Sequence, residues 1–158
     1  MVRPRVPGST AQGFTYLGAL FLVALVSGGL AVVGEDWGVA AQRDKEAELL
    51  FVGHQYRLAI GRYYRYGPRQ YPRSLADLLK DPRRPGTERY LRRLYADPLT
   101  AGGEWGLVRA PDGGIQGVYS LSGERPLKTA GFKPRDRELL GAASYTDWKF
   151  LHAPQARN

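Results

Sequence analysis

The residues that could support catalysis or metal binding are few in this chain, and they are not arranged for either. There is no cysteine, which excludes disulfides, thiolate metal sites and thiol nucleophiles. The two histidines, His54 and His152, have no histidine at a metal-binding spacing. The glycines of residues 102–106 lack the spacing of a phosphate-binding loop and precede a predicted strand. We therefore expect no enzyme, and we name no metal ligand.

Five arginines between residues 83 and 93 are the one surface feature with functional promise. A short helix is expected over residues 87–94, and on it Arg89, Arg92 and Arg93 share one face. That face could bind phosphate groups or the acidic surface of a neighbouring protein. The alternative is a solvated basic face balanced by nearby acidic residues, and the pattern favours this alternative.

The hydropathy pattern divides the chain sharply. Residues 14–33 form a run of 20 residues without a charge. As a helix rising about 1.5 Å per residue, this run would span roughly 30 Å, the hydrocarbon thickness of a bilayer. We therefore predict a leader at residues 1–13 and a transmembrane helix at 14–36. The rest of the chain has room for one small domain.

The charges on either side of the apolar run predict its orientation. Arg3 and Arg5 precede it without an acidic residue, whereas Glu35 and Asp36 follow it. By the positive-inside bias, we expect the N-terminus in the cytoplasm and the C-terminal domain on the other side. The run is too long for a cleavable secretory signal. An uncleaved signal anchor is the stronger alternative.

The junction at the start of the run distinguishes these alternatives. A polar leader ends in Gly13, and Phe14-Thr15-Tyr16-Leu17 begins the unbroken hydrophobic run. This order resembles the type IV prepilin family, whose members carry a short basic leader ending in glycine, then Phe-Thr-Leu and a membrane helix. The resemblance implies that a prepilin peptidase cuts between Gly13 and Phe14 and methylates the new amine. Glycine suits such a cut because the backbone can extend into a protease cleft without a side-chain clash.

The fifth residue after the expected cut departs from the family pattern. Members usually carry glutamate there, and this chain has Gly18. In the family, that carboxylate is thought to pair with the N-terminal amine of a neighbouring subunit. Its absence removes a charge that is costly in a membrane, and it also removes an assembly contact. The resemblance extends to pseudopilins without this glutamate, which are typically minor subunits.

Helical periodicity continues beyond the apolar run. An apolar stripe at spacings of three and four predicts an amphipathic helix over residues 37–66. Gly67-Pro68 should end this helix near Tyr66. The pilin family packs the outer half of such a helix on a β-sheet, so the resemblance implies that the stripe packs the stem against the head. The stripe consists of Leu49, Val52, Tyr56, Ala59 and Tyr63.

A small α+β head is expected over residues 67–158. Ser74 and Asp77 predict the start of a short helix. Residues 104–110 and 115–121 are typical of a β-hairpin, because the glycines between them favour a tight turn. Residues 145–152 alternate between apolar and polar types, which predicts a further strand with Trp148 and Phe150 on one face.

The resemblance also raises the question of calcium, because some type II secretion pseudopilins bind it in the head. The candidate ligands are carboxylates that could converge there. None matches a calcium-ligand pattern, and roles in helix caps and turns fit them better. These carboxylates are Asp97, Asp112, Asp136 and Asp147.

Together these features predict a pilin-like α+β protein of the inner membrane with a periplasmic head. The resemblance implies a pseudopilin of a type II secretion system, with prepilin peptidase and other pseudopilins as partners. The absence of cysteine favours this reading over type IV pilins, whose heads often carry a disulfide. The alternative is a minor pilin of a type IV or DNA-uptake pilus, although nucleic acid is not the expected partner. A membrane-anchored periplasmic enzyme or scaffold is the least favoured class.

Overall fold

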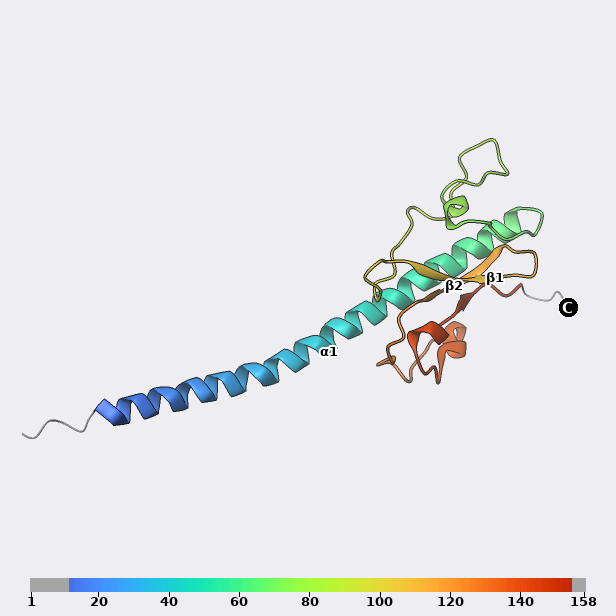
Figure 1. Cartoon of the computed structure of the whole chain (residues 1–158). Helices are drawn as coiled ribbons and strands as arrows, with labels where there is room; N and C mark the ends of the chain where they lie inside the picture. The colour runs from blue at the N-terminus through green and yellow to red at the C-terminus, as the bar shows by residue number, and fades with distance from the viewer. Residues whose placement is uncertain (1–11, 155–158) are drawn as a thin grey trace, which may run out of the picture. The chain divides into compact units, whose positions relative to one another are not determined.

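The computed structural model describes residues 12–154, except for the side chains of residues 12–15 and 25–37. It contains one long α-helix, three short 3₁₀ helices and three strands in that part of the chain (Figure 1). The chain divides into two compact units, Met1–Ala41 and Gln42–Asn158. In chain order the elements are α1 (Gln12–Tyr66), η1 (Leu75–Leu78), β1 (Trp105–Arg109), β2 (Ile115–Ser120), η2 (Pro134–Leu139), η3 (Tyr145–Asp147) and β3 (Phe150–Leu151).

The first unit contains the N-terminal turns of α1, and the side chains described between residues 16 and 24 are exposed. Within the side chains that the structure describes, no helix combines the length and the apolar character needed to cross a membrane. The predicted transmembrane segment at 14–36 includes side chains outside the described residues. Residues 1–11 of the predicted leader also lie outside them. The leader and the span stay predictions.

The second unit is built on a three-stranded antiparallel sheet with the order β1-β2-β3. Figure 1 shows β1 and β2 beside the C-terminal turns of α1. The predicted hairpin is confirmed: Trp105 pairs with Ser120, and Gly113 supplies a positive φ of 79° in the turn. The third strand is only two residues long and pairs with β2 through Phe150 and Leu151.

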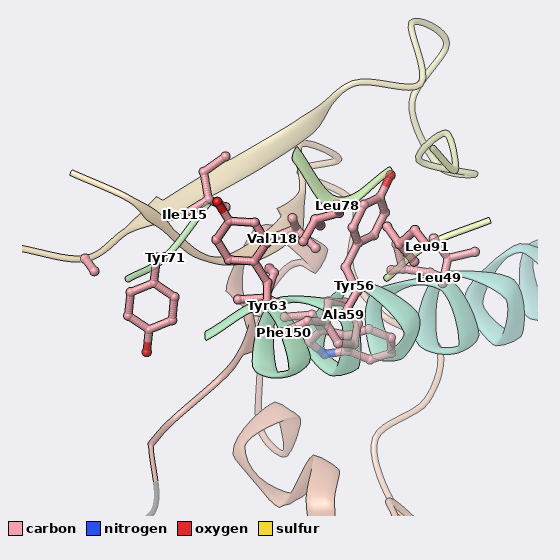
Figure 2. Packing of buried hydrophobic residues seen from close by; sticks show 14 of the residues in the cluster. Leu49, Tyr56, Ala59, Tyr63, Tyr71, Leu78, Leu91, Ile115, Val118 and Phe150 are labelled. Atoms are coloured by element: carbon pink, nitrogen blue, oxygen red, sulfur yellow. The ribbon is translucent and has the colours of Figure 1, made fainter. Parts of the chain in front are cut away.

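The core lies between the sheet and one face of α1. The five residues of the predicted stripe are between 0 and 3% exposed, and Ile60 beside them is fully buried. Figure 2 shows Tyr56, Ala59 and Tyr63 of the helix in one cluster with Ile115 and Val118 of β2 and Phe150 of β3. The helix ends at Tyr66, as the following Gly67-Pro68 predicts. The α+β class and the packing of the long helix on a small antiparallel sheet are therefore confirmed.

The head helix predicted over residues 87–94 is wrong, because this segment is irregular. Its backbone forms hydrogen bonds with residues 78–81 instead of the internal hydrogen bonds of a helix. The amides of Tyr90 and Leu91 both donate to the carbonyl of Leu78, at 2.9 and 3.0 Å, and the amide of Asp81 donates to the carbonyl of Glu88. These long-range hydrogen bonds occupy groups that a helix would have used internally.

The strand predicted over residues 145–152 is mostly wrong. Its first residues form the 3₁₀ helix η3, and only Phe150–Leu151 are in a strand. The carboxylate of Asp147 accepts a hydrogen bond from the amide of Ser144 at 3.1 Å, which favours a helical turn over an extended chain. Trp148 and Phe150 are nevertheless both fully buried, as the alternation predicts.

The short helix expected after Ser74 is confirmed as η1, with Asp77 accepting from the Ser74 amide at 3.0 Å.

Gly53 lies at a close approach between α1 and β3. A Cβ at this position would overlap the ring of Phe150 in β3. Gly61, two turns further along the same helix, faces the ring of His152 in a similar way. Absence of a side chain at Gly53 therefore lets an aromatic ring lie directly on the helix backbone.

We predict opposite effects for alanine at two glycines of α1. Gly53→Ala should lower the free energy of unfolding by roughly 1–3 kcal/mol, because the overpacked Phe150 ring must move. Gly38→Ala, where a Cβ meets open space, should be neutral or stabilising by up to about 1 kcal/mol through helix propensity. Denaturant unfolding followed by tryptophan fluorescence measures both. Equal effects of the two substitutions would contradict this account of the packing.

Candidate functional site

The predicted processing junction lies in the first turns of α1. Gly13 and Phe14 are part of the helix that begins at Gln12, but their side chains lie outside the described residues. Gly18 is exposed, and apart from its chain neighbours and the nearby helix backbone no described atom lies within 4 Å of the position that a Cβ would take. Among the described residues, no contact therefore requires glycine at the position where the prepilin family usually has glutamate.

The predicted arginine cluster divides into two groups with different surroundings. Arg83 and Arg84 lie against the C-terminus of α1, where the last carbonyls of a helix have no partner within the helix. The Arg83 guanidinium donates to the carbonyl of Tyr63 at 2.9 Å, and Arg84 donates to the carbonyl of Tyr66 at 2.8 Å. These two arginines cap the helix. Their positive charge also interacts favourably with the negative end of the helix dipole.

Arg83 is held in place by a buried carboxylate. The Asp81 side chain is 0% exposed and accepts hydrogen bonds from Arg83 Nε at 2.8 Å, Arg83 Nη2 at 2.7 Å and the Tyr90 hydroxyl at 2.9 Å. The Arg83 guanidinium also lies 3.5 Å from the ring centroid of Tyr63. The hydrogen bonds from Arg83 lower the pKa of Asp81 from its ordinary value of 3.8 to about 2.

Arg89 and Arg92 form the second group and line a pocket of about 540 Å³ beside α1. We call this pocket the arginine groove. No acidic residue lines it, and α1 adds a third arginine, Arg62, to its wall. The other lining residues are Phe51, Gln55, Tyr90, Leu91 and Tyr95.

The wall of the arginine groove is fixed to the core through Tyr95. The Tyr56 hydroxyl donates to the Tyr95 carbonyl at 2.9 Å and accepts from the Tyr95 amide at 2.9 Å, while Trp105 Nε1 donates to the same carbonyl at 2.8 Å. Arg93 does not line the groove, and its guanidinium lies 5.0 Å from the ring centroid of Tyr95. The expected helical face of Arg89, Arg92 and Arg93 is therefore wrong, although two of the three do share one pocket.

A second pocket, of about 270 Å³, also includes Phe51 in its lining. Its polar lining is mostly basic, with Lys128, Lys133 and Arg135, and its one acidic residue, Asp136, pairs with Arg57 at 3.0 Å. His54 also lines it, and burial together with Arg135 and Arg57 lowers the pKa of that histidine. Phe51 therefore lies between two pockets whose charged walls are mainly positive.

The carboxylates considered for calcium have other partners in the structure. Asp97 is buried and accepts from the Ser120 hydroxyl at 2.7 Å and from the Leu99 amide at 2.9 Å. Asp112 accepts from the amide of Gly114 in the hairpin turn, and Asp147 caps η3. Across the residues that the structure describes, no three His, Asp or Glu side chains gather where a metal ion could bind.

Sequence reasoning predicted only Arg89 and Arg92 of the residues that line the arginine groove, and it missed Phe51 and Arg62 among the others. Phe51 is 58% exposed, and the stripe at residues 49, 52 and 56 places it away from the buried face. A large apolar residue outside the buried stripe of an amphipathic helix indicates an exposed apolar surface, and this signal could have identified Phe51 from the sequence. Arg62 follows Phe51 by eleven residues, or about three turns, and so lies on the same side of the helix.

Comparison with known proteins adds no assignment: no family model matches the chain, and neither a curated protein nor a solved structure is significantly similar to it.

The depressed pKa of Asp81 predicts an acid-sensitive fold. The contribution of the Asp81 carboxylate to the free energy of unfolding is fully present above the ordinary pKa near 3.8. It is lost as the pH falls through about 2. The free energy of unfolding should therefore fall by roughly 2 kcal/mol over this range through Asp81 alone. Asp81→Asn should be less stable at neutral pH and should lack this part of the pH dependence. Denaturant titrations at pH 2 to 6 give the free energy of unfolding of both proteins as a function of pH. If the two pH dependences are parallel, Asp81 is not the source of the acid sensitivity.

Arg83 and Arg92 should differ in their effects on stability. Arg83→Ala should lower the free energy of unfolding by roughly 3 kcal/mol or more, because it leaves Asp81 buried without its charged partner. Arg92→Ala, which removes an exposed side chain, should change stability by no more than about 0.5 kcal/mol. Thermal unfolding followed by circular dichroism measures both. A similar loss for the two variants would show that the groove arginines are structural as well.

Proposed function

We propose that this protein is a pseudopilin subunit of a type II protein secretion system. In this role it is inserted in the inner membrane, is processed by prepilin peptidase and joins other pseudopilins in a short periplasmic filament. The observation that carries the proposal is the Gly13-Phe14 junction between a basic leader and a long uncharged run. The proposal is a structural role in an assembly and not an enzymatic one.

The fold supports this role through the continuity of α1. The helix runs for 55 residues from Gln12 to Tyr66 without interruption. Its later turns carry the buried stripe, and they pack on the small antiparallel sheet. A stem that begins at the processing junction and packs its later turns on a small head is the arrangement that the prepilin resemblance implies.

Gly18 bears on the place of this subunit in a filament. The usual glutamate would offer a carboxylate to the N-terminal amine of a neighbour, and this chain cannot make that contact. Subunit contacts must therefore come from other surfaces of the chain. The departure favours a minor subunit over an ordinary major one.

Processing of the N-terminus tests the proposal directly. In cells with a working prepilin peptidase, the protein extracted from membranes should begin with N-methylated Phe14, as determined by mass spectrometry. Gly13→Ala should leave Met1 and the leader in place, because the added methyl group hinders the extended backbone at the cut. Gly8→Ala, within the leader but away from the junction, is the matched control and should be processed normally.

An intact leader on the unmodified protein, in cells where a known prepilin substrate is processed, would refute the proposal. That result would favour an uncleaved signal anchor. Normal processing of the Gly13→Ala variant would show that the cut does not depend on this glycine.

A further inference from the structure

The arginine groove gathers three positive charges that no carboxylate of its lining neutralises. Arg62 comes from α1, whereas Arg89 and Arg92 come from the irregular segment that follows η1. Among the described residues, no ion pair includes any of the three. All three side chains are exposed, so a ligand in the groove can reach their guanidinium groups.

The acidic residues close to this segment in the sequence do not balance the groove. The Asp81 side chain is fully buried, and its carboxylate is paired with Arg83. Asp97 is also buried, and its carboxylate accepts from the Ser120 hydroxyl at 2.7 Å. Glu88 is exposed but does not line the groove. The positive charge of the groove is therefore available to an external anion.

The loop wall of the groove is fixed at two places. The amides of Tyr90 and Leu91 donate to the carbonyl of Leu78, and the Tyr56 hydroxyl bonds both the amide and the carbonyl of Tyr95. Since the wall is already ordered, a ligand loses little binding free energy to ordering it. The amides of Tyr90 and Leu91 are also occupied, so they cannot cradle a phosphate group as the free amides of a phosphate site do.

The aromatic residues of the groove are poorly placed for stacking on nucleic-acid bases, which requires open ring faces. The Tyr90 ring packs against the Tyr63 ring, with centroids 5.6 Å apart. The Tyr95 ring has the guanidinium of Arg93 5.0 Å from its centroid. Of the three aromatic residues in the lining, only Phe51 is exposed. The groove therefore offers one open ring and not a series of them.

Apolar side chains accompany the groove arginines on α1. Phe51 is 58% exposed, and Leu58, which is 39% exposed, follows it by seven residues on the same side of the helix. Phe51 and Arg62 are eleven residues apart, which is about 16 Å of helix or the length of about five extended residues. Arginine and aromatic residues are enriched in protein interfaces, where arginine can form two parallel hydrogen bonds with a carboxylate.

We propose that the arginine groove binds an acidic polypeptide segment of a partner protein, in which large apolar residues stand next to the carboxylates. Carboxylates of the segment pair with Arg62, Arg89 and Arg92, and an apolar side chain of the segment packs on Phe51. The site belongs entirely to the second unit. The contact therefore does not depend on processing at Gly13-Phe14, and its failure would leave the proposed function untouched.

Peptide binding to the full-length protein in non-ionic detergent micelles tests the proposal. The probe is a synthetic peptide with the repeat Glu-Glu-Leu, labelled with a neutral dye and followed by fluorescence anisotropy, and empty micelles give the background. We expect it to bind about tenfold or more tightly than peptides with the repeats Gln-Gln-Leu and Glu-Glu-Ser. Equal affinity for the probe and either control peptide would overturn the proposal.

Charge reversal locates the binding site. Arg62→Glu with Arg92→Glu should weaken binding of the Glu-Glu-Leu peptide about tenfold or more and create binding of a Lys-Lys-Leu peptide, which a misfolded variant could not do. Arg73→Glu with Arg125→Glu, two exposed arginines that do not line the groove, is the matched control and should change neither. Binding that is insensitive to the first pair, or lost without the gained specificity, would overturn a direct contact with the groove.

Two further measurements test the apolar contact and the kind of ligand. Phe51→Ser should weaken the Glu-Glu-Leu peptide severalfold and leave the Glu-Glu-Ser peptide unchanged, while Leu140→Ser, at another exposed leucine, should affect neither. An equal loss for both peptides would overturn the role of Phe51. A dye-labelled oligothymidylate that binds more tightly than the Glu-Glu-Leu peptide, and is lost with the Arg62 and Arg92 substitutions, would overturn the proposal and assign the groove to a nucleic acid.

Discussion

The head of this protein depends on burial of one face of α1. Its sheet has strands of five, six and two residues, too little to form an independent core in water. Among the side chains that the structure describes, six of the sixteen buried hydrophobic ones come from the helix, including Tyr56 and Tyr63. Tyr56 also fixes the loop at Tyr95 through its hydroxyl, so the same helix face organises the groove wall. The head and the second half of α1 are therefore one folding unit.

The features that the sequence predicts well are those set by neighbouring residues. The stripe on α1 follows from helical periodicity, and the hairpin follows from the glycines between two apolar segments. The expected helix at 87–94 failed because the amides of Tyr90 and Leu91 bond to Leu78, which local spacing cannot reveal. The alternation at 145–152 identified the buried side chains, but the first three of the eight residues form η3, in which the carboxylate of Asp147 accepts from the Ser144 amide.

The arginines illustrate a similar limit for the candidate site. Composition alone marks the cluster between residues 83 and 93, but it does not separate the capping arginines from those that line a groove. Arg83 is committed to Asp81 and to the end of α1, whereas Arg89 and Arg92 join Arg62, which is about 30 residues away in the sequence. The path of the loop after η1 decides which arginines cap α1 and which line the groove, and the sequence alone does not show that path. The Gly13-Phe14 junction differs from the arginine groove because it can be recognised from consecutive residues in the sequence.

The length of the buried helix face has a mechanical consequence. The buried hydrophobic stripe of α1 extends from Leu49 to Tyr63, which is about 20 Å of helix. Arg83 and Arg84 hold the last carbonyls beyond them. A force along the stem would act on these contacts in shear, so many of them would have to yield together. A force across the stem could peel them apart one after another, and the joint should therefore be stiffer along the helix axis than across it.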